Sequence, residues 1–153
     1  MQKIEKFETL LKQVESIISG EENIYANLAN TCALIKDTFD HFWIGFYLVD
    51  EQKNQLVLGP FQGPVACTRI PFGHGVCGSA WKEKKTFVVD DVHQFPGHIA
   101  CSSLSNSEIV IPLFKNENVF AVLDIDSDKV ATFDEVDKEY FEKLTSIVSK
   151  SIV

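Results

Sequence analysis

The sequence has no apolar run long enough to cross a membrane. None of its 153 residues falls in an uninterrupted apolar stretch of the roughly 18 residues that a membrane span needs. Residues 1–16 also carry too many charged side chains for a secretory signal. We therefore expect a cytoplasmic protein with no membrane partner.

Basic residues are scarce as well. The chain has 14 Lys and Arg against 22 Asp and Glu, a net charge of −8. Contacts to phosphates need clustered Lys and Arg, so we expect no nucleic-acid partner. There is no internal repeat or low-complexity segment, and the length suits one sizeable core.

No paired C-x2-C spacing, which is typical of structural zinc, occurs among the four cysteines. His93, His98 and Cys101 lie close together in the sequence, and His74 and Cys77 lie elsewhere, but this is a weak metal pattern. We expect no metal and no other cofactor. Because nothing signals export, we expect the cysteines to be inert core residues, metal ligands or redox groups rather than structural disulfides.

Residues 1–39 predict two amphipathic helices separated at Gly20. The first apolar stripe contains Ile4, Phe7, Leu11, Val14 and Ile18. The second contains Ile24, Leu28, Thr31, Ile35 and Phe39. Cys32 lies beside the second stripe, so we expect it to pack in the core.

Residues 42–127 predict a sheet with loops. The run 42–49 is typical of a strand, 55–58 of its hairpin partner, 59–64 (GPFQGP) of a loop and 65–70 of a short strand.

The second half of this region predicts a short helix over 76–84, a strand over 86–89 and a hairpin of 108–114 with 119–127. Residues 90–107 have no period, and a loop of that length in a compact domain favours an active-site loop.

The segment Thr132–Glu135 predicts a capping box that opens a last helix over 133–152. Its predicted buried side chains are Val136, Tyr140, Leu144, Ile147 and Val148. Hairpin-length links favour an α+β fold, with a mainly antiparallel sheet, helices packed outside it and a pocket on the other face.

Cys101 lies in the long loop, where reactive groups concentrate, and His93 and His98 offer positive character nearby. Two cysteines are candidate partners. Cys67 lies near a strand start, and Cys77 lies in a first helical turn, whose dipole favours a thiolate. Position alone is equally consistent with a Cys77 that only packs behind the glycine turn.

Asp124 and Asp126 project from one face of a strand, which requires solvent or a cationic ligand between them. Glu108 opens the neighbouring strand, so three carboxylates converge at one pocket rim in this interpretation. Trp43 and Tyr47 share a face of the first strand with Gly45 between them. They are either ordinary core or a slot for a methyl group.

Three motifs resemble free methionine-(R)-sulfoxide reductases of the GAF fold: GPVACTRIPFGHGVCGSAW, DVHQFPGHIACSSLSNSEIVIPLF and AVLDIDS. The resemblance covers essentially the whole chain and implies a single GAF domain over residues 1–153. Its parts are two N-terminal helices (1–39), the sheet with active-site loops (42–127) and the C-terminal helix (133–152).

The resemblance implies that Cys101 attacks the sulfoxide sulfur and becomes a sulfenic acid. Cys67 then resolves it as a disulfide, Cys77 is a secondary or alternative partner, and a thioredoxin-type reductant restores the thiols. A homodimer is also expected. His74 is a departure, since relatives usually carry Lys or Arg there, and Cys32 has no role in the family pattern.

The same resemblance gives the substrate contacts. Glu108, Asp124 and Asp126 bind the ammonium group and assist protonation of the sulfoxide oxygen. Backbone N–H groups around Ile99, Ala100 and Cys101 hold the carboxylate, while Trp43 and Tyr47 enclose the methyl end. Both ends of a free amino acid are then gripped, which excludes a peptide.

Two other classes of protein compete with this interpretation. A GAF module that senses a small ligand without turnover shares the fold, but it has no need of Cys67, Cys77 and Cys101 together. A zinc-stabilised interaction protein would carry bound metal after purification.

Overall fold

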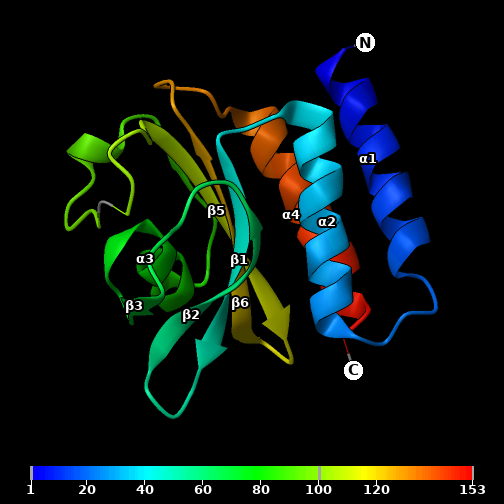
Figure 1. The fold of residues 1–153 in the computed structure, drawn as a ribbon, viewed down its shortest axis with the longest axis horizontal. Helices are drawn as coiled ribbons and strands as arrows, with labels where there is room; N and C mark the ends of the chain where they lie inside the picture. The colour runs from blue at the N-terminus through cyan, green and yellow to red at the C-terminus, as the bar shows by residue number, and fades with distance from the viewer. Residues whose placement is uncertain (1, 100, 153) are drawn as a thin grey trace.

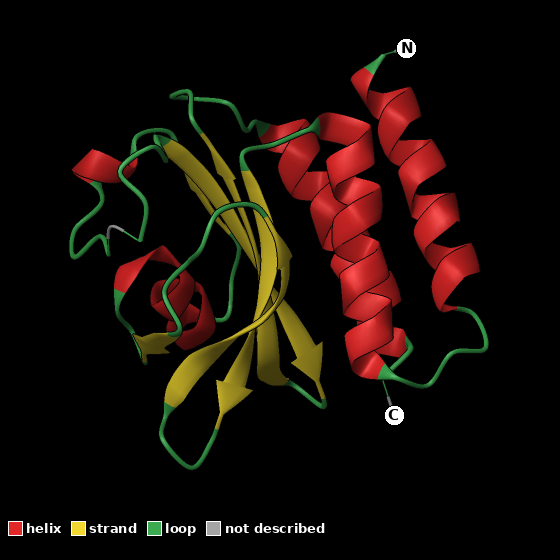
Figure 2. Ribbon diagram, viewed as in Figure 1, coloured by secondary structure: helices red, strands yellow, loops and turns green. Residues whose placement is uncertain are grey.

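A single six-stranded antiparallel sheet divides the molecule into two layers of helices (Figures 1 and 2). The computed structural model describes residues 2–99 and 101–152. Helices α1 (Lys3–Ile18), α2 (Ile24–Phe39) and α4 (Glu135–Lys150) cover one face. The short helix α3 (Gly75–Glu83) and the long loops lie on the other face, which is therefore the face with room for a site.

The strands follow the order β3-β2-β1-β6-β5-β4. Their bounds are β1 Trp43–Asp50, β2 Gln55–Gln62, β3 Arg69–Pro71, β4 Phe87–Val89, β5 Ser107–Lys115 and β6 Asn118–Ser127. The α+β class with a mainly antiparallel sheet is confirmed. Among the described residues of the long loop, Val92–Gln94 forms a turn of 3₁₀-helix.

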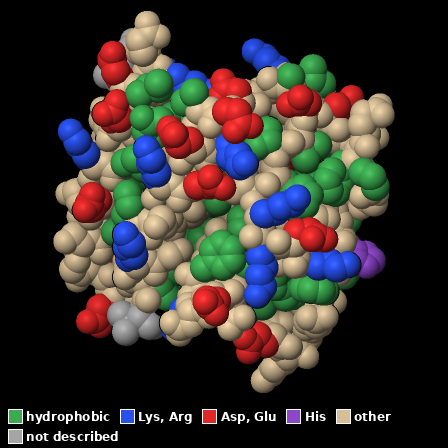
Figure 3. Space-filling model, turned by 180° about the vertical axis from the view of Figure 1, so that it is seen from behind, with side chains coloured by type: hydrophobic (Ala, Val, Ile, Leu, Met, Phe, Trp, Pro, Cys, Tyr) green, Lys and Arg blue, Asp and Glu red, His purple; other side chains and the backbone are tan. Residues whose placement is uncertain are grey.

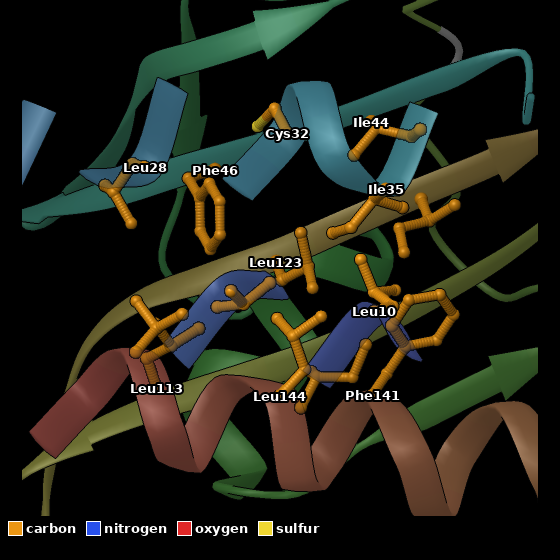
Figure 4. Close-up of a cluster of buried hydrophobic side chains, with 14 of the residues drawn as sticks. Leu10, Leu28, Cys32, Ile35, Ile44, Phe46, Leu113, Leu123, Phe141 and Leu144 are labelled. Carbon is orange, nitrogen blue, oxygen red and sulfur yellow. The ribbon is translucent and has the colours of Figure 1, made fainter. Parts of the chain in front are cut away.

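The helical face holds the larger core (Figure 4). Leu10, Leu28 and Ile35 from the N-terminal helices meet Phe46 and Leu123 of the central strands. Cys32 is fully buried in this cluster, as its place beside the second stripe predicted, and its thiol donates to the Pro60 carbonyl at 3.5 Å. A buried thiol without a charged neighbour is inert, so Cys32 serves the fold.

The GPFQGP segment was wrongly predicted as a loop, because β2 runs through it to Gln62. A bulge lets the strand continue: Gly45 pairs with Phe61, whereas Tyr47 pairs with Leu58. Strand β3 pairs with β2 only up to Val57, so Pro60 occupies an edge where no backbone donor is required.

The strand predicted over 65–70 is also shorter than expected. Only Arg69–Pro71 pairs with β2, and residues before Thr68 form a loop on the sheet surface. Pro64 cannot donate to a ladder, and the side chain of Val65 points into solvent. This loop carries Cys67.

The last helix begins later than the Thr132–Glu135 pattern predicted. Asp134 is its N-cap and accepts from the backbone N–H groups of Val136 at 3.0 Å and Asp137 at 3.2 Å. The Asp137 side chain accepts from the Asp134 N–H at 2.8 Å, so the capping box joins these two aspartates. Lys3 of α1 pairs with both carboxylates and ties the two helices together.

The buried face of α4 also differs from the predicted one. It contains Asp137, Phe141, Leu144, Thr145 and Val148. The predicted core residues Val136, Tyr140 and Ile147 are only half-buried at its edge. The ion pair with Lys3 turns Asp137 inward, which sets the rotation of the helix.

Loss of the cap is expected to weaken the fold. Asp134→Ala removes the acceptor of two backbone N–H groups, so the free energy of unfolding should fall by about 1 kcal/mol. Urea denaturation measures this change. Asp128→Ala, an exposed aspartate whose side chain makes no hydrogen bond among the described residues, is the control. Equal losses in both variants would contradict the role of Asp134.

No helix among the described residues combines the length and apolar character of a bilayer span. On the face seen in Figure 3, Lys and Arg side chains are scattered among Asp and Glu side chains.

Candidate functional site

Three carboxyl groups meet on the sheet face that α3 covers. Asp126 of β6 pairs directly with Glu108 of β5, and Asp124 lies two residues away on the same face of β6. Glu108 and Asp124 are each only 6% exposed. The predicted convergence therefore occurs, but below the surface rather than at a pocket rim.

These carboxyl groups resist ionisation. Burial and the charge of Asp124 raise the pKa of Glu108 well above its ordinary 4.5. Burial and Asp126 raise the pKa of Asp124, and burial and Glu108 raise the pKa of Asp126. Asp124 Oδ1 is buried and has no hydrogen-bond partner among the described residues. Such a cluster binds a cation or shares protons.

The cluster should cost stability at neutral pH. A carboxyl whose folded pKa lies above its unfolded value destabilises the folded state as pH rises past the unfolded pKa of about 4. Asp124→Asn removes one such group, so we expect the free energy of unfolding to increase by about 1 kcal/mol or more at pH 7. The increase should shrink towards zero near pH 4.

Urea denaturation between pH 4 and pH 8 measures this effect, with Asp128→Asn as the exposed control. A gain that does not change with pH would show that charge in the cluster is not its cause.

Cys67 and Cys101 form a disulfide, with Cα atoms 5.3 Å apart. Two aromatic side chains of β1 hold the Cys67 loop in place. Tyr47 Oη donates to the Cys67 carbonyl at 2.9 Å, and Trp43 Nε1 donates to the Pro64 carbonyl at 3.0 Å. Aromatic rings on the sheet thus fix one wall of the site through their polar ends.

Gly45 does not leave the open slot that the sequence suggested. The Trp43 indole fills the space above it, and a Cβ at Gly45 would collide with that ring. The indole stacks between Tyr47, at 6.0 Å between ring centroids, and Phe61 of β2, at 5.3 Å. Trp43 and Tyr47 do share one face, as predicted.

The Cys101 loop packs on the start of α3. Gly75 has φ +63, and its missing side chain admits Ile99, whose Cγ1 lies 3.2 Å from the ideal Cβ position. The Cys101 N–H donates to the Ile99 carbonyl at 3.1 Å, so this amide is engaged within the loop. Ala100, a predicted substrate contact, lies outside the described residues.

Cys77 behaves opposite to its predicted helix-dipole effect. Burial and the charges of Asp124 and Glu108 raise its pKa well above the ordinary 9.0. Its Sγ lies 3.9 Å from Glu108 Oε2, and the side chain is 4% exposed. The nearby carboxyl groups outweigh the dipole, so Cys77 stays a thiol in this environment.

His98 gives little positive charge to the Cys101 loop. Burial and the neighbouring His93 lower the pKa of His98 below its ordinary 6.5. Nε2 of His93 lies 3.1 Å from Asn106 Oδ1. The imidazole rings of His93 and His98 lie edge to face. The neutral imidazole of His98 is therefore favoured at neutral pH, which corrects the expectation from the sequence.

The three carboxyl groups border one cavity of about 50 Å³, together with Trp43, Tyr47, Cys77, His98 and Cys101. One buried water needs about 10–15 Å³, so the cavity admits a few water-sized groups. Its wall includes residues that sequence reasoning missed: Phe42, Ile70, Val76 and Ser105. The three apolar ones carry no signal that separates them from ordinary core. No Lys or Arg lines the cavity within the described part of the chain.

Such an arrangement can bind a small cation beside the Cys67–Cys101 disulfide. The carboxyl cluster lines the cavity from the sheet, and Cys101 lines it from the long loop. A positive group on a ligand would offset the cost of burying carboxylate charge in this cluster. The other end of such a ligand would then lie near the sulfurs.

Comparisons with known proteins agree with this fold. The GAF domain family matches residues 21–153. GAF domain-containing protein A of Dictyostelium discoideum is 57% identical over 146 residues, which cover 95% of this chain and 92% of that protein. Free methionine-R-sulfoxide reductase of Saccharomyces cerevisiae is 44% identical over 160 residues, which cover 100% of this chain and 89% of that enzyme.

Among solved structures, the free methionine-R-sulfoxide reductase of Neisseria meningitidis in complex with its substrate superposes with a TM-score of 0.97. It is 53% identical, and the match covers 99% of this chain and 90% of that chain. The chain belongs to the GAF-domain family of free methionine-(R)-sulfoxide reductases.

Proposed function

We propose that this protein reduces free L-methionine-(R)-sulfoxide to methionine. The observation that carries the proposal is the Cys67–Cys101 disulfide, because Cys101 lines a cavity that three carboxyl groups, those of Glu108, Asp124 and Asp126, also line. Reduction of a sulfoxide consumes two electrons and two protons and releases water. A pair of thiols supplies both electrons, and acidic groups with raised pKa supply protons.

The first step is attack by the Cys101 thiolate on the sulfoxide sulfur. The oxygen is protonated and passes from the substrate sulfur to Cys101 Sγ, the transient bond between the two sulfurs breaks, methionine leaves with the electron pair, and Cys101 becomes a sulfenic acid. Glu108, Asp124 or Asp126 protonates the oxygen, since their raised pKa values keep a proton available at neutral pH.

The second step is attack by Cys67 on the sulfenic acid. Water leaves, and the disulfide that the structure contains is the product. The Cα separation of 5.3 Å in this product lies within the usual range for a disulfide. Cys77 is the alternative resolving thiol, but its raised pKa makes it the poorer nucleophile.

Substrate binding uses the two ends of a free amino acid. The ammonium group pairs with Glu108, Asp124 and Asp126, and Trp43 with Tyr47 forms the apolar wall for the methyl end. The substrate carboxylate is held by backbone N–H groups near Ile99 and Cys101. Because the Cys101 N–H now bonds to Ile99, this contact requires the loop to rearrange when the disulfide opens.

A protein dithiol of the thioredoxin type recycles the enzyme in this proposal. The loops that carry the disulfide present two exposed apolar side chains, Val65 (89% exposed) and Leu104 (60% exposed). Cys67 and Cys101 are themselves only half-buried. An attacking thiolate of another protein can therefore reach the disulfide from solvent.

We also propose a homodimer that works in the cytoplasm, where dithiol reductants are plentiful. Light scattering on the purified protein tests the oligomeric state. A ligand sensor of the GAF fold would need neither the dithiol pair nor its reductant, so the cysteines favour an enzyme.

The decisive experiment follows each epimer of free methionine sulfoxide during recycling by thioredoxin, thioredoxin reductase and NADPH. We expect the R epimer to disappear, while the S epimer and N-acetylated or peptide-bound (R)-sulfoxide persist. Reduction of the blocked substrates at similar rates would contradict capture of both ends of a free amino acid. No reduction of any of them would contradict the reductase itself.

A further inference from the structure

Cys77 belongs to a set of metal-type donors that its sequence spacing does not reveal. Its Sγ and carboxylate oxygens of Glu108 and Asp124 all lie within 4.8 Å of one another. The three residues come from α3, β5 and β6, so their mutual position is fixed by the packing of a helix on the sheet. All three side chains are buried.

Asp124 supplies an independent sign of a missing partner. Its Oδ1 is buried and accepts no hydrogen bond among the described residues, and its side chain is aimed into the cavity. An unsatisfied buried acceptor costs about 1–3 kcal/mol, and more when it is charged. The described cavity wall offers no Lys or Arg to satisfy it, so its available partners are a proton shared with the neighbouring carboxyl groups or a cation from outside.

The donor set selects the kind of cation. Zn²⁺ binds thiolate at about 2.3 Å and carboxylate oxygen at about 2.0–2.2 Å, and tetrahedral geometry then separates donors by about 3.3–3.8 Å. Small side-chain rotations close the present spacing to that range. Ca²⁺ and Mg²⁺ prefer oxygen ligands alone and gain nothing from Cys77.

We propose that Cys77, Glu108 and Asp124 bind a divalent cation of the zinc type. On binding, the Cys77 thiol forms a sulfur–metal bond and releases its proton to solvent, and no oxidation occurs. A water molecule or Asp126 completes four ligands, for which the cavity has room. The site needs neither Cys67 nor Cys101, so it exists in the disulfide form.

One consequence rests on the proposed function. The substrate ammonium group uses Glu108 and Asp124 in that proposal, so the metal ion and free methionine should exclude each other. The protein would then lose access to its substrate when zinc occupies the site.

Cadmium titration of the disulfide form tests the site, because Cd²⁺ bound to a thiolate has a charge-transfer absorption band in the ultraviolet. The only free thiols among the described residues of this form are Cys77 and the core residue Cys32. We expect one Cd²⁺ per chain and the thiolate band. Cys77→Ser and Cys77→Ala should both lose the band, and Cys32→Ser should keep it.

Calorimetry in two buffers of different ionisation enthalpy should show proton release on Zn²⁺ binding, and Asp124→Asn should weaken binding by more than about tenfold. A band that persists without Cys77, or no band in wild type, overturns the proposal. None of these measurements requires turnover. A negative result for metal binding is therefore distinguishable from a lack of reductase activity.

Excess L-methionine should weaken Cd²⁺ binding if both use the same carboxylates. Cd²⁺ binding that excess L-methionine leaves unchanged would overturn only this shared use of Glu108 and Asp124.

Discussion

Cys101→Ser is expected to lower turnover of free methionine-(R)-sulfoxide by at least about 10³-fold. A serine hydroxyl does not ionise near neutral pH, and it cannot accept the sulfoxide oxygen as a thiolate does. The fold should be unaffected by the change, because the Cys101 side chain lies in a loop at the cavity wall and not in either core cluster. Steady-state loss of substrate under thioredoxin recycling measures the effect.

Cys32→Ser is the matched control for this variant. Cys32 is buried on the opposite face of the sheet and borders no part of the cavity. We expect this control to retain the wild-type rate even if its stability falls. Activity that survives in Cys101→Ser would remove this residue from the mechanism, and activity lost in both variants would point to damage of the fold.

Cys67→Ser should release one equivalent of methionine per chain and then stall under thioredoxin recycling. The first step needs only Cys101, but the sulfenic acid then has no partner at the position that the disulfide defines. Rapid mixing of the reduced variant with substrate measures the burst of methionine. Dimedone labelling followed by peptide mass mapping should place the sulfenic acid on Cys101.

A Cys67→Ser variant that sustains turnover would contradict this assignment. Loss of that turnover on further replacement of Cys77 would transfer the resolving role to Cys77. The raised pKa of Cys77, caused by burial and by Asp124 and Glu108, predicts instead that Cys77 resolves slowly at neutral pH.

Periodicity predicted most of the fold because most elements bury one regular face. The stripe of α2 and most of the stripe of α1 are buried or half-buried as their helical period predicts, although Ile4 is exposed, and the dense apolar runs of β1 and β6 form strands that are buried on both faces. Strand β2 is the exception: Gly59 and Pro60 are turn residues in isolation, and only the bulge and the free edge of the sheet make them compatible with a strand. The bulge and the sheet edge are tertiary features, so the local sequence around Gly59 and Pro60 could not predict a strand there.

The site was predicted in part for the same reason. That Asp124 and Asp126 share a face follows from the two-residue period of a strand. The contact of Asp126 with Glu108 depends on the register of β5 against β6, which the hairpin length suggested. The approach of Cys77 to these carboxyl groups depends on how α3 packs on the sheet, so sequence predicted a lowered pKa where the structure raises it.

The pairing of Cys67 with Cys101 could not be obtained from spacing. Four cysteines allow several pairings, and the two loops that carry this pair are separated by α3 and β4. Resemblance to the reductase family suggested the pair, and the hydrogen bonds from Tyr47 and Trp43 give the physical reason that one loop is held near the other.

A single turnover of the fully reduced protein is the most direct measurement of the proposed chemistry. Reduced enzyme is mixed with excess free methionine-(R)-sulfoxide without any recycling system, and methionine and peptide disulfides are quantified together. The proposal predicts one methionine per chain, with a Cys67–Cys101 disulfide formed in equal amount. Methionine formed without that disulfide, or the disulfide formed equally with the S epimer, would contradict it.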